Sequence, residues 1–166
     1  MCCQMKNYLG LFGPEMLGWI TRFWMPIGRK IILIGGSIHG CELAEFLVKR
    51  GRKVIILETS GELGTGLPGV LKPKLLKWLA KKGVTMMTEI KYEEVTGSGL
   101  TITTKEGEKK TIEADTILPA EPLRPNAELF KALQGKVREI YCIGDCKEPR
   151  LISDAIADGF KIANTI

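Results

Sequence analysis

The stretch from residue 30 to residue 58 constrains the fold of this chain more than any other. It opens with a short apolar run, Lys30 to Ile34, and such a run of β-branched and leucine residues is typical of a parallel strand buried on both faces. A glycine-rich turn over residues 35–40 follows, and apolar residues then recur at helical spacing until Gly51. A second apolar run over residues 53–58 completes a strand–turn–helix–strand unit. The pattern predicts two parallel strands joined by a crossover helix.

The rest of the chain extends this pattern, with one change of character. We expect further elements at residues 72–82 (helix), 84–87 (strand), 115–118 (strand), 127–133 (helix), 140–143 (strand) and 152–163 (helix). Residues 89–113 differ, because short alternating segments broken by glycines indicate an antiparallel meander. The predicted fold is α/β: a Rossmann-like doubly wound parallel sheet with an inserted antiparallel β-meander.

The composition excludes several classes of protein. Of the 166 residues, 45% are hydrophobic and 26% are charged, which is the balance of an ordinary globular domain. The net charge of +5 is spread along the chain and does not form the basic clusters of nucleic-acid-binding modules. No uninterrupted apolar run of about 20 residues occurs, so a membrane-spanning helix is not expected. We therefore expect neither a nucleic acid nor a membrane as a partner.

The cysteines indicate reduced thiols. The chain has five, and a single histidine accompanies them: Cys2, Cys3, Cys41, Cys142, Cys146 and His39. No cysteine pair has the two-residue spacing of a redox-active disulfide, and ligands for a metal site are too few and too far apart. An odd count at irregular spacing is typical of cytoplasmic thiols, most of which fill the core. We therefore expect a cytoplasmic protein without a metal site.

The glycine-rich turn has the residues that a dinucleotide-binding fold needs after its first strand. Gly35 allows the tight bend out of the strand, and Gly36 follows it. Ser37 stands where a small residue lets the backbone approach a pyrophosphate, and Gly40 allows helix and strand to pack closely. The helix that begins near Ile38 would direct its N-terminal amides and positive dipole end toward the phosphates.

Glu58 indicates which dinucleotide the turn would hold. It lies 18 positions after Gly40 at the end of the second strand, where a carboxylate accepts hydrogen bonds from the adenosine ribose. A carboxylate here would repel a 2′-phosphate, and residues 59–61 include no arginine to receive one. NAD(H) is therefore favoured over NADP(H).

Two questions stay open at this site. The Cβ of Ser37, which replaces the usual middle glycine, could crowd the pyrophosphate, or its hydroxyl could donate a hydrogen bond to a phosphate oxygen. A Rossmann-like fold that has lost its ligand would show the same pattern. No catalytic residue is assigned, because His39 has no identifiable partner and Cys41 is expected to be buried against the sheet.

Residues 1–27 form a separate, apolar N-terminal segment. A short helix is predicted from Pro14, with Leu17, Ile20 and Trp24 on one face. This aromatic face either packs on the domain that follows or contacts a neighbouring domain outside this chain.

A second motif carries a family resemblance. The stretch from Gly144 to Arg150, which leads into Asp154 and Gly159, is its most specific part, and the glycine turn and residues 124–126 agree with it. Together they resemble the C-terminal part of bacterial 2,4-dienoyl-CoA reductases and related NADH:flavin oxidoreductases, the trimethylamine dehydrogenase group. That part is itself similar to the pyridine nucleotide–disulfide oxidoreductases. The resemblance covers about residues 25–166.

The resemblance implies roles for several residues. The glycine turn and Glu58 would bind NAD, and Glu42 would lie near the nicotinamide carboxamide. Asp145, after Gly144, would match the aspartate that hydrogen-bonds the ribitol of FAD. Ala120 begins a motif of alanine, any residue and glycine, but this chain departs from it at residues 121–122. The carboxylate of Glu121 would lie near the cofactor cleft and weaken binding.

The resemblance also implies a division into parts. Residues 28–135 would form an NAD(P)-binding Rossmann-like domain, and residues 136–166 the C-terminal piece of a split FAD-binding domain. The family's FMN-holding barrel, its cysteine cluster for an iron–sulfur centre and its ADP-binding unit for FAD have no counterpart in residues 1–27. FAD would therefore bind only with a flavin-bearing domain or chain that supplies the rest of its site.

Two functions are the main interpretations of these observations; a third, a subunit that completes its FAD site with another chain, is supported only by the aromatic N-terminal segment. In the first, the chain is the NAD(H)-binding domain of a flavin-dependent oxidoreductase, which holds the nicotinamide for hydride transfer to FAD in a larger enzyme and does not turn over alone. In the second, it is a non-catalytic ADP- or NAD-binding or domain-docking module that has lost turnover. A preference for reduced nicotinamide dinucleotide over ADP would separate the two.

Overall fold

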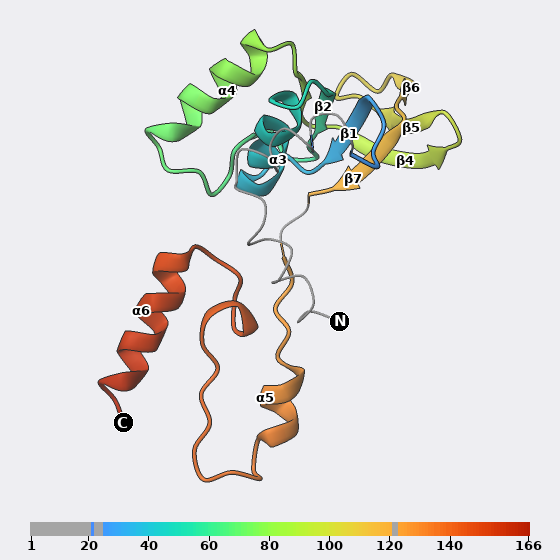
Figure 1. Cartoon of the computed structure of the whole chain (residues 1–166). Coiled ribbons are helices and arrows are strands. Elements are labelled where there is room, and N and C mark those ends of the chain that lie inside the picture. Colours follow the sequence, from blue (N-terminus) through green and yellow to red (C-terminus); the bar gives the residue numbers. More distant parts are fainter. Residues whose placement is uncertain (1–20, 22–24, 121–122) are drawn as a thin grey trace. The chain divides into compact units, whose positions relative to one another are not determined.

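The chain folds into two compact units. The computed structural model describes residue 21, residues 25–120 and residues 123–166 (Figure 1). The first unit extends to Glu121, and the second begins at Pro122. Helix α5 (Glu128–Leu133) therefore belongs to the second unit, although the sequence placed the end of the nucleotide-binding domain at residue 135. The assignment of the two units to an NAD and an FAD domain stays a prediction.

Two expectations from the sequence fall outside the described residues. The predicted N-terminal helix has its apolar face at Leu17, Ile20 and Trp24, and the carboxylate expected near the cofactor cleft is that of Glu121. Both stay predictions.

The first unit is built on a parallel sheet of four strands in the order β3–β2–β1–β7. The strands are β1 (Lys30–Ile34), β2 (Lys53–Leu57), β3 (Thr85–Met87) and β7 (Thr116–Pro119). In the register of the sheet, Ile32 lies between Ile55 and Ile117. Helix α3 (Ile38–Val48) connects β1 to β2, and α4 (Leu71–Lys81) connects β2 to β3. Parallel strands joined by crossover helices confirm the predicted Rossmann-like α/β fold.

The central strand β1 is buried on both faces. Ile31 and Leu33 belong to a core cluster that they share with residues of α3 and α4. Ile32 belongs to a second cluster, with Leu100 and Ile102. Successive side chains of a strand point to opposite faces, so a strand that is buried on both faces requires an unbroken run of apolar residues. This requirement explains why the sequence of β1 shows no alternation of apolar and polar residues.

The antiparallel meander contributes to the second of these clusters. It consists of β4 (Lys91–Thr96), β5 (Gly99–Thr103) and β6 (Lys109–Glu113), with β5 in the middle. Leu100 and Ile102 of β5 pack with Leu57 of the parallel sheet. The Tyr92 hydroxyl also donates a hydrogen bond to the Leu57 carbonyl, at 2.8 Å. The predicted meander is confirmed, and the structure adds that it covers a face of the parallel sheet.

The second unit has helices but no strand among its described residues. It contains α5, the 3₁₀ turn η1 (Gly144–Cys146) and α6 (Ile152–Ala163), and the two predicted helices are confirmed. The prediction of a strand at residues 140–143 is wrong. Ile143 is extended, with φ −135° and ψ 159°, but no described strand pairs with it. An extended segment becomes part of a sheet only when a neighbouring strand takes up its hydrogen bonds.

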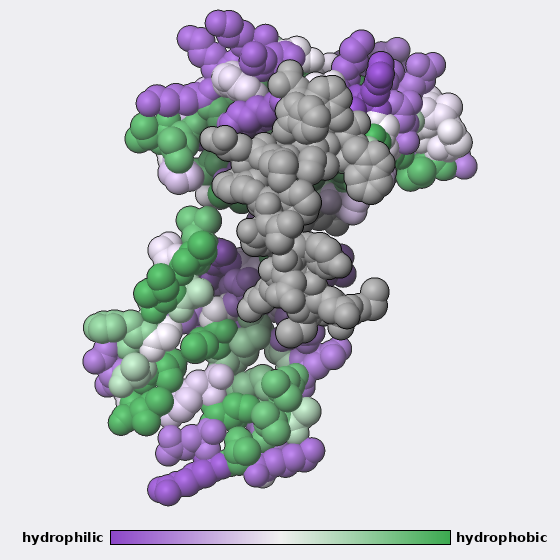
Figure 2. Space-filling view, viewed as in Figure 1, coloured by the Kyte–Doolittle hydropathy of each residue, from purple (hydrophilic) through white to green (hydrophobic). Residues whose placement is uncertain are grey.

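The apolar face of α6 is exposed. Ile152, Ile156 and Phe160 have exposed fractions of 82%, 67% and 72%. Figure 2 shows apolar side chains gathered on the surface of this unit. An amphipathic helix normally buries its apolar stripe against another element. The described residues of the second unit provide no such cover.

Gly28, before β1, packs directly on the start of β7. A Cβ at Gly28 would lie 2.1 Å from the Cβ of Asp115, so an added methyl group would force the two segments apart. We expect Gly28→Ala to lower the free energy of unfolding by about 1–3 kcal/mol, the usual cost of overpacking, in a chemical denaturation experiment. Gly69→Ala is the control, because nothing lies within 4 Å of a Cβ there. An equal loss in both variants would contradict the packing explanation.

Asp115 also links β7 to β1 through hydrogen bonds. Its Oδ2 accepts the backbone N–H groups of Lys30 and Arg29, both at 2.8 Å, and these bonds lower the pKa of the carboxyl group. A lowered folded-state pKa means that the stabilisation is present above the ordinary value of about 3.9 and is lost as the pH falls through the folded value.

We therefore expect Asp115→Asn to reduce stability at neutral pH and to flatten the loss of stability below about pH 4, because the neutral amide does not titrate. Thermal unfolding measured across the acid range would show this. Glu113→Gln is the matched control, since its carboxylate forms an exposed ion pair with Lys30. An acid profile of Asp115→Asn that matches the unmodified chain would refute the role of Asp115.

Candidate functional site

The turn between β1 and α3 has the geometry that its glycines predict. Gly35 has a φ of 106°, a left-handed conformation that favours glycine, and its N–H donates to the Leu57 carbonyl at 2.8 Å. A Cβ at Gly40 would lie 2.0 Å from the Gly35 carbonyl oxygen. Only a glycine at this position lets α3 approach the end of β1 so closely. The tight bend and the close packing inferred from the sequence are therefore both present.

Ser37 stands at the N-terminus of α3 with an unused hydroxyl. It is the N-cap residue, but its side chain makes no capping hydrogen bond. Its Oγ is buried and has no partner among the described residues. A buried hydroxyl without a partner costs free energy, so this atom is poised to bond to a ligand that reaches the turn.

Backbone N–H groups next to this hydroxyl are also open. The N–H groups of Ser37, His39 and Gly40 donate to no other described residue, whereas that of Cys41 donates to the Ser37 carbonyl at 3.0 Å. Free amides in the first turn of a helix, together with the positive end of its dipole, form an anion-binding site. The residues present therefore fit a pyrophosphate.

The loop after β2 packs on the same turn, which the sequence did not reveal. The Ile38 N–H donates to the Thr65 carbonyl at 2.8 Å, and the Gly64 N–H donates to the Gly36 carbonyl at 2.6 Å. A Cβ at Gly36 would lie 2.3 Å from a methyl carbon of Leu63. The glycine-rich composition of residues 61–69 was the available signal, because it gives the loop the freedom to follow the turn. The loop thus forms hydrogen bonds with some of the backbone groups of the turn.

Glu58 follows β2 with its carboxylate beside the turn. Oε2 accepts the Gly36 N–H at 2.6 Å, and Oε1 accepts the Ser60 N–H at 2.9 Å. Partial burial alone would raise the pKa of Glu58, but the N–H groups of Ser60 and Gly36 and the nearby hydroxyls of Ser60 and Thr59 outweigh it and lower the pKa. The carboxylate is therefore ionised at neutral pH and held against the turn.

Ala120, which follows β7, and Glu42 of α3 differ in burial. Ala120 is buried, its N–H donates to the Ile34 carbonyl at 2.7 Å, and its Cβ would be 3.6 Å from a Cβ at Gly40. It therefore lines the same edge of the sheet as the turn. Glu42 is exposed and lines an open pocket of about 310 Å³ between α3 and α4, with Lys74 among its neighbours.

His39 and Cys41 have no arrangement for catalysis. Cys41 is buried as predicted, its Sγ donates to the Gly36 carbonyl at 3.4 Å, and burial raises the pKa of the thiol. His39 is exposed, and its side chain has no hydrogen-bond partner among the described residues. Within that part of the chain, no three His, Cys, Asp or Glu side chains could hold a metal ion, and no helix is long and apolar enough to cross a bilayer.

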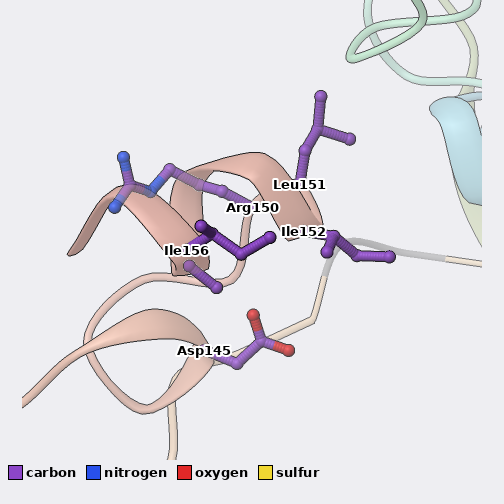
Figure 3. A pocket seen from close by; sticks show the side chains of 6 residues that line it. Asp145, Arg150, Leu151, Ile152 and Ile156 are labelled. Atoms are coloured by element: carbon purple, nitrogen blue, oxygen red, sulfur yellow. The ribbon is translucent and has the colours of Figure 1, made fainter. Parts of the chain in front are cut away.

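Asp145, which follows Gly144 in the second unit, lines a pocket. Gly144 has a φ of 60°, and the turn that it allows carries the exposed Asp145. Asp145 lines an open pocket of about 400 Å³ with Arg150, Leu151 and Ile152 among the other lining residues (Figure 3). This pocket combines a carboxylate with an apolar wall from α6.

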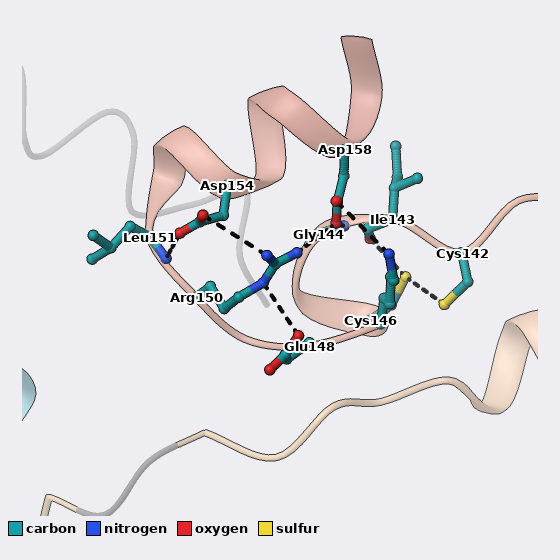
Figure 4. Close-up of polar contacts among 10 residues, drawn as sticks. Cys142, Ile143, Gly144, Cys146, Glu148, Arg150, Leu151, Asp154 and Asp158 are labelled. Carbon is teal, nitrogen blue, oxygen red and sulfur yellow. Dashed lines mark hydrogen bonds and ion pairs between the residues drawn. The ribbon is translucent and has the colours of Figure 1, made fainter. Parts of the chain in front are cut away.

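Asp158 of α6 holds the Gly144 turn in place, and sequence reasoning missed it. Its Oδ2 accepts the Gly144 N–H at 3.2 Å and a guanidinium N–H of Arg150 at 2.9 Å (Figure 4). Lys147 lies 3.8 Å from its other oxygen. Desolvation would raise the pKa of Asp158, but these donors and charges lower it. The residue carries no motif signal of its own, because its role depends on how α6 returns to the turn.

Comparisons with known proteins agree with this geometry. A model of the pyridine nucleotide-disulphide oxidoreductases matches residues 16–159. NADH oxidase of Thermoanaerobacter brockii is 29% identical over 136 residues, and bilirubin reductase of Mediterraneibacter gnavus is 29% identical over 143 residues. The solved complex of 2-naphthoyl-CoA reductase with 2-naphthoyl-CoA superposes with a TM-score of 0.78 at 30% identity.

The chain corresponds to one part of each of these proteins. The matches cover 81%, 86% and 86% of this chain but 21%, 22% and 22% of the three relatives, so the chain spans about a fifth of their length. The family match includes both the glycine turn and the Gly144 turn. The chain therefore belongs to the pyridine nucleotide-disulphide oxidoreductase family.

Proposed function

We propose that the first unit binds NAD(H) and holds the nicotinamide for hydride transfer to FAD in a larger enzyme of the 2,4-dienoyl-CoA reductase-like group. The observation that carries the proposal is the buried, unpartnered Oγ of Ser37 beside the open N–H groups of His39 and Gly40. An unpaired polar cradle at a helix N-terminus is the arrangement that a pyrophosphate completes. The same observation supports a hydrogen bond from the Ser37 hydroxyl to a phosphate oxygen, rather than crowding by its Cβ.

The chain's own residues would divide the recognition between them. The first turn of α3 would hold the pyrophosphate, and the ionised Glu58 would accept the adenosine ribose hydroxyls and disfavour a 2′-phosphate. Ala120 would line the cleft, and Glu42 would contact the carboxamide. When bound, the nicotinamide supplies a hydride, and the role of these residues is to orient it.

The second unit would supply a part of the flavin site. Gly144 would present Asp145 to the ribitol of FAD, while Asp158 keeps this turn in position. The exposed apolar face of α6 supports a flavin-bearing domain or chain as the partner that completes the site. Exposure of apolar side chains to water is unfavourable in free energy, and a partner would bury them.

The names of the relatives support a role in electron transfer before the electrons reach the final acceptor. They refer to NADH, bilirubin and 2-naphthoyl-CoA, yet all three proteins share the region that this chain represents. A region shared by proteins that are named for different compounds supports a step that they have in common. We therefore assign the chain to nucleotide handling and leave the final acceptor, an enoyl thioester by resemblance, to another part of the enzyme.

One observation favours the alternative, a non-catalytic ADP- or NAD-binding or docking module. The Thr65 carbonyl already accepts the Ile38 N–H, and Leu63 packs against Gly36. The loop after β2 therefore occupies part of the turn that a dinucleotide would contact. A site narrowed in this way would retain the adenosine half of the cofactor more readily than the whole of it.

Calorimetric titration of the full chain with NADH, ADP and NADPH tests the proposal. We expect NADH to bind more tightly than ADP, because the nicotinamide half adds contacts, and NADPH to bind at least about tenfold more weakly than NADH, since the Glu58 carboxylate repels the 2′-phosphate. Equal affinities for NADH and ADP would support the alternative module. Binding of none of the three would overturn the cofactor assignment.

A substitution at Glu58 tests the origin of the selectivity. We expect Glu58→Gln to weaken NADH binding by about tenfold, the value of a charge-assisted hydrogen bond, and to narrow the preference over NADPH by a similar factor. Glu62→Gln is the matched control, because its exposed carboxylate lies in the same loop but pairs with Lys72. The assignment of Glu58 fails if both variants change the two affinities equally.

A further inference from the structure

Two cysteine side chains meet in the Gly144 turn of the second unit. The Sγ atoms of Cys142 and Cys146 are 3.4 Å apart, and both side chains are partly exposed (Figure 4). The remaining described cysteine, Cys41, is buried and has its sulfur against the Gly36 carbonyl. The pair was not evident from the sequence, because three residues separate its members, and the usual criterion for a redox pair is a separation of two.

The backbone of the turn explains the contact. Ile143 is extended and Gly144 is left-handed, so the chain reverses direction between the two cysteines. The N–H groups of Lys147 and Glu148 both donate to the Gly144 carbonyl, at 2.9 and 3.0 Å, and close the turn. The two side chains are thereby held on the same side of a short loop.

The hydrogen-bond pattern indicates which of the two thiols donates to the other. The Cys146 thiol donates to the Ile143 carbonyl at 2.9 Å, so the proton between the sulfurs comes from Cys142. The hydrogen bond to Cys146, with a contribution from burial, raises the pKa of the Cys142 thiol, and the nearby Lys147 opposes this. Cys142 is therefore a thiol at neutral pH.

We propose that Cys142 and Cys146 form a reversible intramolecular disulfide by exchange with a small-molecule disulfide of the glutathione class. The thiolate of one cysteine attacks a sulfur of the small disulfide, whose S–S bond breaks and releases one thiolate. The second cysteine loses its proton and attacks the mixed disulfide, which releases the other thiolate. The two protein thiols lose two electrons and two protons, and the small disulfide is reduced to two thiols.

The geometry requires little movement for this reaction. The two sulfurs must close from 3.4 Å to the S–S bond length of about 2.05 Å, a change that rotation about the side-chain bonds can supply. The disulfide would close a small ring around Gly144 and Asp145 and restrict the turn. That this restriction changes flavin binding rests on the proposed function, but formation of the disulfide does not.

Peptide mass analysis of the full chain tests the proposal directly. The purified chain is equilibrated with oxidised glutathione, quenched with acid, alkylated and cut with trypsin, which releases residues 139–147 as one peptide between Arg138 and Lys147. We expect most of this peptide to lose two hydrogen masses and to resist alkylation. Reduced glutathione in excess should restore both alkylation sites, and the rate of oxidation should rise with pH as the thiols ionise.

Three variants serve as controls. In Cys142→Ser and Cys146→Ser, the remaining thiol should accumulate a glutathione adduct, because no second thiol resolves it. Cys41→Ser should behave as the unmodified chain. A peptide that carries glutathione adducts without an internal disulfide would overturn the proposal, and so would one that stays reduced. The mass readout is independent of NADH binding, so its failure is distinct from a failure of the calorimetric test.

Discussion

The close approach of α3 to the end of β1 is the contact on which the rest of the first unit depends. A Cβ at Gly40 would stand 2.0 Å from the Gly35 carbonyl oxygen, so the helix can begin beside the strand only because this side chain is absent. The contact brings the first turn of α3 to the edge where the parallel strands end. Glu58 follows the neighbouring strand β2 at the same edge, and its carboxylate accepts the N–H of Gly36 in the turn. The cradle is therefore a consequence of packing at one glycine.

The hydrogen-bonding groups of the turn fall into two sets. The chain itself satisfies the Gly36 N–H through Glu58 and the Ile38 N–H through Thr65. The hydroxyl of Ser37 and the next amides of α3 have no partner among the described residues. The first set fixes the shape of the turn and the charge of Glu58, while the second is the set that the proposed pyrophosphate would use. Such a division lets a site be rigid without being filled by its own protein.

The second unit is held together differently. None of the residues in α5, η1 or α6 is buried, and the Gly144 turn is anchored by Asp158, which joins it to Arg150. Charge-assisted hydrogen bonds of this kind are strong and directional, so they can fix a loop where no core exists. The same loop holds Asp145 toward its pocket and brings Cys142 and Cys146 together. A change in the oxidation state of the cysteines would thus act on the segment that carries the carboxylate.

The sequence by itself determined the features that depend on neighbouring residues: the buried strand β1, the glycines of the turn, the start of α3 and the position of Glu58. Local spacing and the absence of a Cβ are sufficient causes for these. Tertiary structure decided the rest, because the causes lie far along the chain. Residues 140–143 form no strand because no described strand pairs with them. The meander is defined by its packing on the parallel sheet, which lies outside its own sequence. The contact of Asp158 with Gly144 likewise requires a chain reversal, which residue spacing alone does not specify.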